Sequence, residues 1–223
     1  MTLLIIVCLL LTALCCRAGT QFLLQRKQEA HRRAFLYKSI AGSCFVLIGV
    51  LLAICRAQGW WLAAGLFCGL LGDQLLAMRK IYPQRHDLYF CTGAVAFSVG
   101  HIFYIVGISR FFTKPMWVAL PAFGVLLILS FLLTRRADTG RMQLSSLLYV
   151  GIVALVCAAA LCALIQSPGI STGMLLIGSI SFFVSDNLLI LQTFGGKQTR
   201  GINIWLHITY YLAQLLIGWS ILF

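Results

Sequence analysis

Long apolar runs separated by short polar connectors occupy almost all of this 223-residue chain. A helix needs about 20 apolar residues to cross the hydrocarbon core of a bilayer, where no free backbone group can be satisfied. The sequence therefore predicts an all-α polytopic transmembrane bundle of eight helices in one domain. The predicted spans are Thr2–Leu24, Phe35–Cys55, Gly59–Met78, Leu88–Phe111, Pro115–Leu133, Leu144–Ile165, Gly169–Phe194 and Ile202–Phe223.

The composition leads to the same class. Hydrophobic residues make up 61% of the chain and charged residues only 10%, which lies outside the range of soluble globular proteins. A net charge of +12 is also typical of nucleic-acid binding, but here the Lys and Arg residues are concentrated in connectors between apolar runs. That distribution is typical of a membrane topology signal, so we expect no nucleic-acid partner.

The connectors also predict sidedness, because short cytoplasmic loops are enriched in Lys and Arg. Most of the 17 basic residues fall in the odd-numbered connectors, leaving Arg56, Arg110 and Lys114 for the other face. Both termini are therefore predicted on the non-cytoplasmic side. The apolar stretch Leu3–Cys16 is interpreted as a retained helix, because no basic residue precedes it. The short loops favour a bacterial inner membrane over a eukaryotic endomembrane.

Nine cysteines lie within or at the edges of the apolar runs, and no two have Cys-x-x-Cys spacing. Cysteine in such places is typically a small packing residue. We therefore expect neither a disulfide framework nor a metal site, and no cofactor.

Two acidic residues, Asp73 and Asp186, lie inside predicted spans and in similar surroundings, Gly-Leu-Leu-Gly-Asp-Gln-Leu-Leu and Phe-Phe-Val-Ser-Asp-Asn-Leu-Leu. An ionised carboxylate costs several kcal/mol in hydrocarbon, so an intramembrane aspartate indicates a functional site. We expect each aspartate to be the partner of the other.

The spacing of the two aspartates predicts a weak parallel repeat. Four helices separate them, so the chain divides into halves 1–112 and 113–223, related by an axis along the membrane normal, with a site at their seam. The segments His101-x-x-Tyr104 and His207-x-x-Tyr210 look similar, but their depths differ and we treat the match as coincidental.

Other polar residues fall near the aspartates in depth or share their helices, and can converge in the interior of the bundle. These are Ser185, Asn187, His101, Tyr104, Tyr210, Tyr211 and Gln214. Depth pairs His101 and Tyr104 with Tyr211 and Gln214, and we expect a neutral His101 to donate a hydrogen bond to an aspartate or to shuttle a proton. The alternative is a structural network of satisfied hydrogen bonds. Arg79 and Lys80, close to Asp73, could hold a phosphate, although topology explains much of their charge.

Four segments carry a resemblance to a known family: Gly72-Asp73, residues 97–104, Ser185-Asp186-Asn187-Leu-Leu, and the ending Tyr210-Tyr211-Leu-Ala-Gln214-Leu-Leu-Ile. Together, from about the third helix to the C-terminus, they resemble the YhhN family of membrane proteins. The characterised members of this family are lysoplasmalogenases.

The resemblance implies hydrolysis of the vinyl ether of a lysoplasmalogen, which releases a fatty aldehyde and glycerophosphoethanolamine or glycerophosphocholine. It places the two intramembrane aspartates of the family at Asp73 and Asp186. It also places the family's His, Tyr and Gln positions at His101, Tyr104, Tyr211 and Gln214. The partners it implies are a lysophospholipid and the bilayer; the oligomeric state stays open.

These residues suit that chemistry. Protonation of the β-carbon of a vinyl ether gives an oxocarbenium ion, which water attacks, so one proton donor and one anion are needed. Two neighbouring carboxyl groups in a low dielectric do not easily ionise together. Our hypothesis is that one aspartate is the general acid, while the other stabilises the cation and takes a proton from water.

Two other functions fit parts of the pattern. A small-solute or lipid transporter could use a polar intramembrane site, but the aspartate segments lack the Gly or Pro interruptions of broken transport helices. A zinc-dependent membrane lipid hydrolase could use His101, His207 and the aspartates, although their unequal depths disfavour one shared ion.

Overall fold

The computed structural model describes residues 1–27, 31–135, 143–195 and 199–223. The described chain is all-helical, which confirms the predicted fold class of eight helices. The helices are α1 (Thr2–Lys27), α2 (His31–Arg56), α3 (Trp60–Ile81), α4 (His86–Ser109), α5 (Leu120–Thr134), α6 (Gln143–Gln166), α7 (Ile170–Phe194) and α8 (Arg200–Trp219). Short 3-10 turns precede α4 (η1, Pro83–Arg85) and α5 (η2, Met116–Ala119) and follow α8 (η4, Ser220–Leu222).

Seven of these helices are long and apolar enough to cross a membrane, as expected of a multi-pass integral membrane protein. The exception is α5, which has 15 residues and so extends only about 22 Å. The predicted span Pro115–Leu133 is therefore too long at its start, where residues 116–119 form a 3-10 turn instead. Proline is tolerated in the first turn of a helix but not in its interior, so Pro121 fixes the start of α5 at Leu120.

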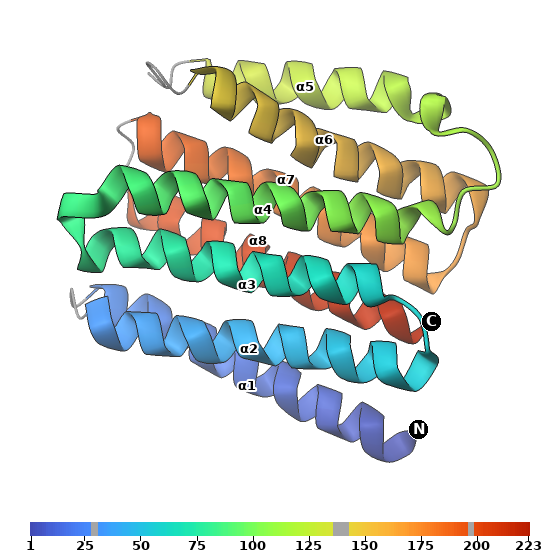
Figure 1. The fold of residues 1–223 in the computed structure, drawn as a ribbon, viewed down its shortest axis with the longest axis horizontal. Helices are drawn as coiled ribbons and strands as arrows, with labels where there is room; N and C mark the ends of the chain where they lie inside the picture. The colour runs from blue at the N-terminus through green and yellow to red at the C-terminus, as the bar shows by residue number, and fades with distance from the viewer. Residues whose placement is uncertain (28–30, 136–142, 196–198) are drawn as a thin grey trace.

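The helices run side by side along the long axis of the molecule, with α1 and α2 at one edge and α5 and α6 at the other (Figure 1). Both termini lie at the same end. Helix α8 packs against α1, α2 and α3 as well as against α7. This arrangement does not show the predicted parallel repeat, because a helix of the second half is built into the first.

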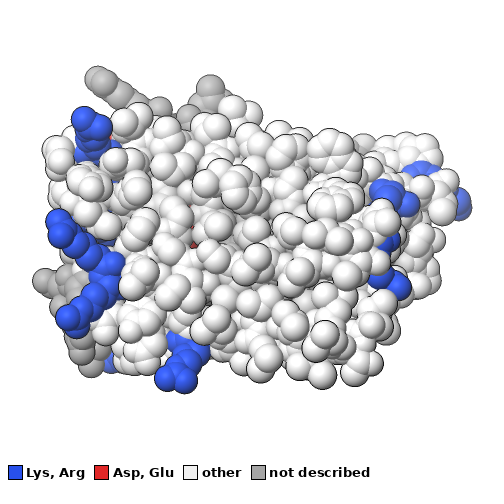
Figure 2. Space-filling view, turned by 60° about the horizontal axis from the view of Figure 1, so that its bottom comes forward, with Lys and Arg blue, Asp and Glu red and all other residues white. Residues whose placement is uncertain are grey.

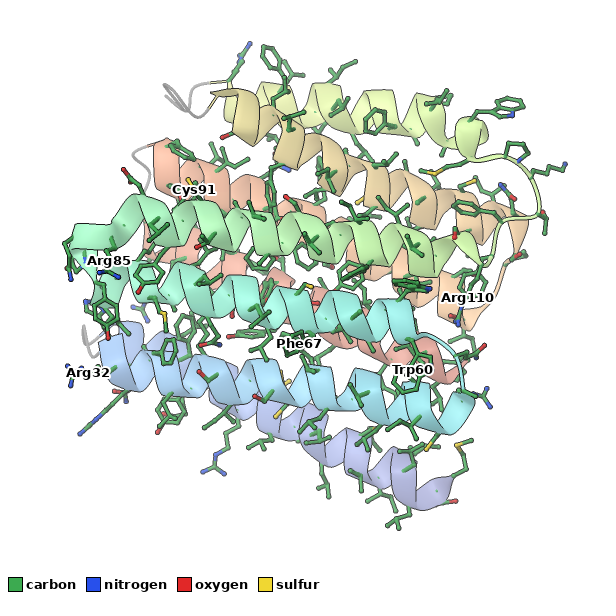
Figure 3. All side chains as sticks on the ribbon, in the orientation of Figure 1. Arg32, Trp60, Phe67, Arg85, Cys91 and Arg110 are labelled. Atoms are coloured by element: carbon green, nitrogen blue, oxygen red, sulfur yellow. The ribbon has the colours of Figure 1, made fainter. Side chains whose placement is uncertain are left out.

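The outer surface has the polarity of a membrane protein. Figure 2 shows one face on which Lys and Arg gather mainly toward the two ends, with a broad uncharged band between them. Arg32 and Arg85 lie at one end, and Trp60 and Arg110 lie at the end that carries the termini (Figure 3). Arg136, Arg141 and Lys197, which contribute to the predicted sidedness, fall outside the described residues. The orientation in the membrane stays a prediction.

Glycines bring α3 and α4 into close contact. A Cβ atom at Gly65 would lie 2.9 Å from the carbonyl oxygen of Gly100 and 2.3 Å from the ring of Tyr104. At Gly72 it would lie 3.0 Å from the carbonyl oxygen of Gly93. Small residues are the usual means of close helix approach in membranes, where hydrophobicity does not drive helices together. This contact fixes the position of Asp73, which follows Gly72.

We expect Gly65→Val to lower the thermal stability of the detergent-solubilised protein, because the added methyl groups force α3 away from α4 at a cost of about 1–3 kcal/mol. Gly124→Val is the matched control, since a Cβ atom there meets nothing within 4 Å and the loss of a helical glycine is the same. Unfolding midpoints followed by loss of monodisperse protein on heating measure both variants. Equal midpoints for the two would contradict this account of the contact.

Candidate active site

Asp73 and Asp186 line one cavity between α2, α3, α7 and α8, and both are buried, with 5% and 4% of their surfaces exposed. The cavity has a volume of about 60 Å³, which is room for a few water molecules. Its polar lining consists of His31, Lys38, Asp73, Arg79, Lys80, Ser185, Asp186, Gln192, His207 and Tyr210. The structure therefore brings the two predicted acids to one site.

The first partner of Asp73 is a lysine and not the second aspartate. The ammonium of Lys38 lies 2.7 Å from Oδ1 of Asp73, and Lys38 is itself only 5% exposed. Lys38 is one of the basic residues assigned above to the odd-numbered connectors. That assignment is wrong, because α2 begins at His31 and Lys38 lies about two turns inside the helix. The signal was available, since Lys38 falls within the predicted span Phe35–Cys55.

A second polar contact fixes α2 against α3 next to this ion pair. The hydroxyl of Ser39 donates to Oε1 of Gln74 at 2.8 Å. Lys38 and Ser39, which are adjacent on α2, thus contact Asp73 and Gln74, which are adjacent on α3. The two contacts set the register of α2 on α3.

The side chains in contact with Asp186 are a tyrosine and a histidine. The hydroxyl of Tyr149, on α6, donates to its Oδ2 at 2.9 Å, and Nε2 of His101 lies 3.8 Å from the same oxygen. Tyr149 was missed by the sequence analysis, since a tyrosine near the start of an apolar run carries no distinguishing signal. Asp73 and Asp186 thus have different neighbours within one cavity.

The tautomer of His101 follows from its second nitrogen. Nδ1 lies 2.7 Å from the carbonyl oxygen of Phe97, which only accepts, so Nδ1 carries the hydrogen. In a neutral ring Nε2 is then an acceptor, and it faces Asp186. The expectation that a neutral His101 donates to an aspartate is therefore wrong: a proton between these two groups is held by Asp186, or His101 is charged.

Tyr104, Gln214 and Tyr210 form a connected network. Tyr104 donates to Oε1 of Gln214, whose Nε2 donates to the hydroxyl of Tyr210 at 3.2 Å. Tyr210 in turn donates to the carbonyl oxygen of Gly69 at 3.0 Å, one turn before Asp73. Tyr104 and Gln214, which the sequence places at similar depth, are thus in direct contact. Of the three, only Tyr210 lines the cavity, so the other two position it.

The remaining predicted site residues divide into two groups. Ser185, Arg79 and Lys80 line the cavity, and the Ser185 hydroxyl donates to the carbonyl oxygen of Leu206. Asn187 faces α5, where it accepts from Ser130, and Tyr211 packs toward Gly19 of α1. Neither of these two lines the cavity, because each projects from a different side of its helix.

The alternatives are also testable against the described residues. No three His, Cys, Asp or Glu side chains of the described residues gather as metal ligands would. The nine cysteines are free. Helices α3 and α7 run unbroken past their aspartates, unlike the discontinuous helices typical of many transporter sites.

Residues 33–221 match the model of the YhhN family. The chain belongs to the YhhN family. The matched segment begins in α2, one helix earlier than the resemblance described above, and it contains Lys38 as well as both aspartates. No curated protein matches the chain. No solved structure matches it either. Nearly all of the cavity lining of this YhhN protein lies inside the family match; Phe22 and His31 precede it.

We expect Lys38→Met to destabilise this YhhN protein by about 3–5 kcal/mol, because it leaves the Asp73 carboxylate buried beside an apolar side chain. The double variant Lys38→Met/Asp73→Asn should recover part of that loss, since no uncompensated charge remains. Lys114→Met, at an exposed lysine, is the control. Thermal midpoints in detergent for the wild type, Lys38→Met, Asp73→Asn and the double variant give the coupling energy of the pair. Strictly additive losses of stability would show that the two residues are not coupled.

Proposed function

We propose that this protein is a membrane-embedded hydrolase that cleaves the vinyl ether of lysoplasmalogens to a fatty aldehyde and glycerophosphoethanolamine or glycerophosphocholine. Membership of the YhhN family, which includes lysoplasmalogenases, supports the reaction class. The observation that carries the proposal is that two buried carboxyl groups with different partners line one water-sized cavity.

The two aspartates take different roles because their contacts differ. An ammonium at 2.7 Å favours the ionised form of Asp73. Asp186 has no such cation at hydrogen-bonding distance among the described residues. It faces Nε2 of His101, and the deep burial of that ring favours its neutral form, in which Nε2 is an acceptor. Asp186 is therefore the general acid, and Asp73 the anion that stabilises positive charge. This assignment keeps the hypothesis of one protonated and one ionised aspartate and adds which of them takes each role.

The proposed reaction consists of protonation of the vinyl ether, addition of water and collapse of the hemiacetal. Asp186 gives its proton to the β-carbon, and the vinyl ether becomes an oxocarbenium ion beside the Asp73 carboxylate. Water adds to the α-carbon and loses a proton to a carboxylate of the site. The hemiacetal then collapses to the aldehyde: its hydroxyl gives its proton to a carboxylate of the site, the C–O bond to glycerol breaks, and a carboxyl group of the site protonates the glycerol oxygen. Each positioned acid or base of this kind is worth about 10²–10⁴ in rate.

The head group has a place at the basic part of the lining. Arg79 and Lys80 lie in the last turn of α3, and both line the cavity that contains the two aspartates. Since the cavity volume admits water and little more, the phosphate lies outside the aspartate pair, against these two cations. Arg and Lys are the usual ligands of phosphate oxygens.

Purified protein supplied with a lysoplasmalogen should release a fatty aldehyde, while the saturated single-chain ether lipid should give none. Asp73→Asn and Asp186→Asn should each lower kcat by about 10²–10⁴, because the amide neither donates a labile proton nor carries charge. Asp87→Asn is the matched control, since Asp87 is exposed in the first turn of α4 and outside the cavity. Full turnover in both amide variants would refute the proposed function.

Tyr149→Phe should lower kcat about ten-fold, since it removes the hydroxyl that donates to Asp186 and a hydrogen bond to a charged or acidic group is worth about 1.5–3 kcal/mol. Tyr211→Phe makes the same chemical change in a buried tyrosine of α8 that does not line the cavity, and it should leave kcat close to that of the wild type. Aldehyde release under saturating substrate measures both. A larger loss in Tyr211→Phe than in Tyr149→Phe would contradict this placement of the site.

A further inference from the structure

A second cavity, of about 370 Å³, lies between α3, α4, α6 and α7. Its lining is mainly apolar and includes Phe90, Ala94, Val95 and Ile152, and no charged side chain of the described residues takes part. We refer to this cavity as the apolar groove. Cys91, which also lines it, marks its position on α4 (Figure 3).

The apolar groove adjoins the cavity that contains the two aspartates. Leu76, Phe97 and Leu189 line both. Tyr149 lines the groove, while its hydroxyl donates to Asp186. A single layer of side chains therefore separates an apolar space from the candidate acid.

The apolar groove is also open toward lipid. Val95 is 63% exposed and Leu148 62% exposed, and both belong to the uncharged outer surface of the bundle. A hydrocarbon chain can therefore reach the groove from the bilayer, between α4 and α6, without passing through water.

We propose that the apolar groove is the site that binds the hydrocarbon chain of the ether lipid substrate; this inference rests on the proposed function. The vinyl ether joins the first carbon of the chain to glycerol. With the chain in the groove and the head group against Arg79 and Lys80, the reacting bond lies at the layer formed by Leu76, Phe97 and Leu189, next to Asp186.

Ala94→Phe tests the chain site, because a bulky side chain fills the groove. Transfer of a chain from lipid into the groove gains little hydrophobic free energy, so the site works by providing space. We expect the ratio of kcat/KM for a hexadecenyl substrate to kcat/KM for a hexenyl substrate to fall at least about ten-fold. Val99→Phe, on the lipid-facing side of the same helix and outside the lining, should leave the ratio unchanged. An unchanged ratio in Ala94→Phe would overturn the inference.

A binding measurement separates the chain site from catalysis. In vesicles of diacyl phosphatidylcholine, a maleimide should label the exposed Cys91, and a saturated single-chain ether lipid, which is not hydrolysed, should abolish that labelling. Glycerophosphocholine alone should not protect Cys91, and labelling of Cys55, exposed and outside the groove, is the internal control. Peptide mass spectrometry reports each cysteine separately.

The outcomes distinguish the two proposals. Protection of Cys91 without any aldehyde from a lysoplasmalogen would refute the hydrolase and support the chain site. Aldehyde release without protection would support the hydrolase and overturn the chain site. A Cys91 that maleimide does not label even before the single-chain lipid is added would overturn the chain site, because the groove would not be free to receive a substrate chain.

Discussion

The buried ion pair between Lys38 and Asp73 is the interaction on which the candidate site depends. Removing two charges from water costs several kcal/mol for each ion, and only close contact with full hydrogen bonding compensates for that cost. The pair lies where α2 meets α3, and the contact between Ser39 and Gln74 beside it fixes the register of the two helices. It also holds a negative charge at one wall of the cavity that Asp186 lines as well.

Asp186 differs from Asp73 through its neighbours and not through its depth. Its oxygen meets a hydroxyl donor and an imidazole nitrogen, whereas Asp73 meets an ammonium. Two carboxyl groups placed in unlike surroundings are the usual way in which one site provides an acid and an anion at the same pH. The difference arises from three helices, α2, α4 and α6, that carry no acidic residue of the site.

The sequence predicted what the bilayer dictates, and it missed what depends on helix rotation. Eight helices follow from run length, and a shared cavity for Asp73 and Asp186 follows from the cost of burying them. Pro121 shortened the fifth helix below a full span. The sequence did not predict Lys38 and Tyr149 as site residues, because a lysine near the end of a span is typical of a topology signal and a tyrosine in an apolar run is typical of a packing residue. Asn187 and Tyr211 project away from the cavity, which spacing alone does not reveal when both faces of a helix are buried.

The arrangement of the polar cavity and the apolar groove follows from how helices pack in lipid. Hydrophobicity does not distinguish the interior of such a bundle from its surroundings, so small residues and polar contacts decide which faces meet. The glycines of α3 and α4 bring these helices together along one line, and Phe97 projects from it toward Phe182 and Tyr210. Phe97 thus stands between the charged lining and the groove. The lysoplasmalogen of the proposed reaction has the same division, with a polar head group and an apolar chain that meet at its ether oxygen.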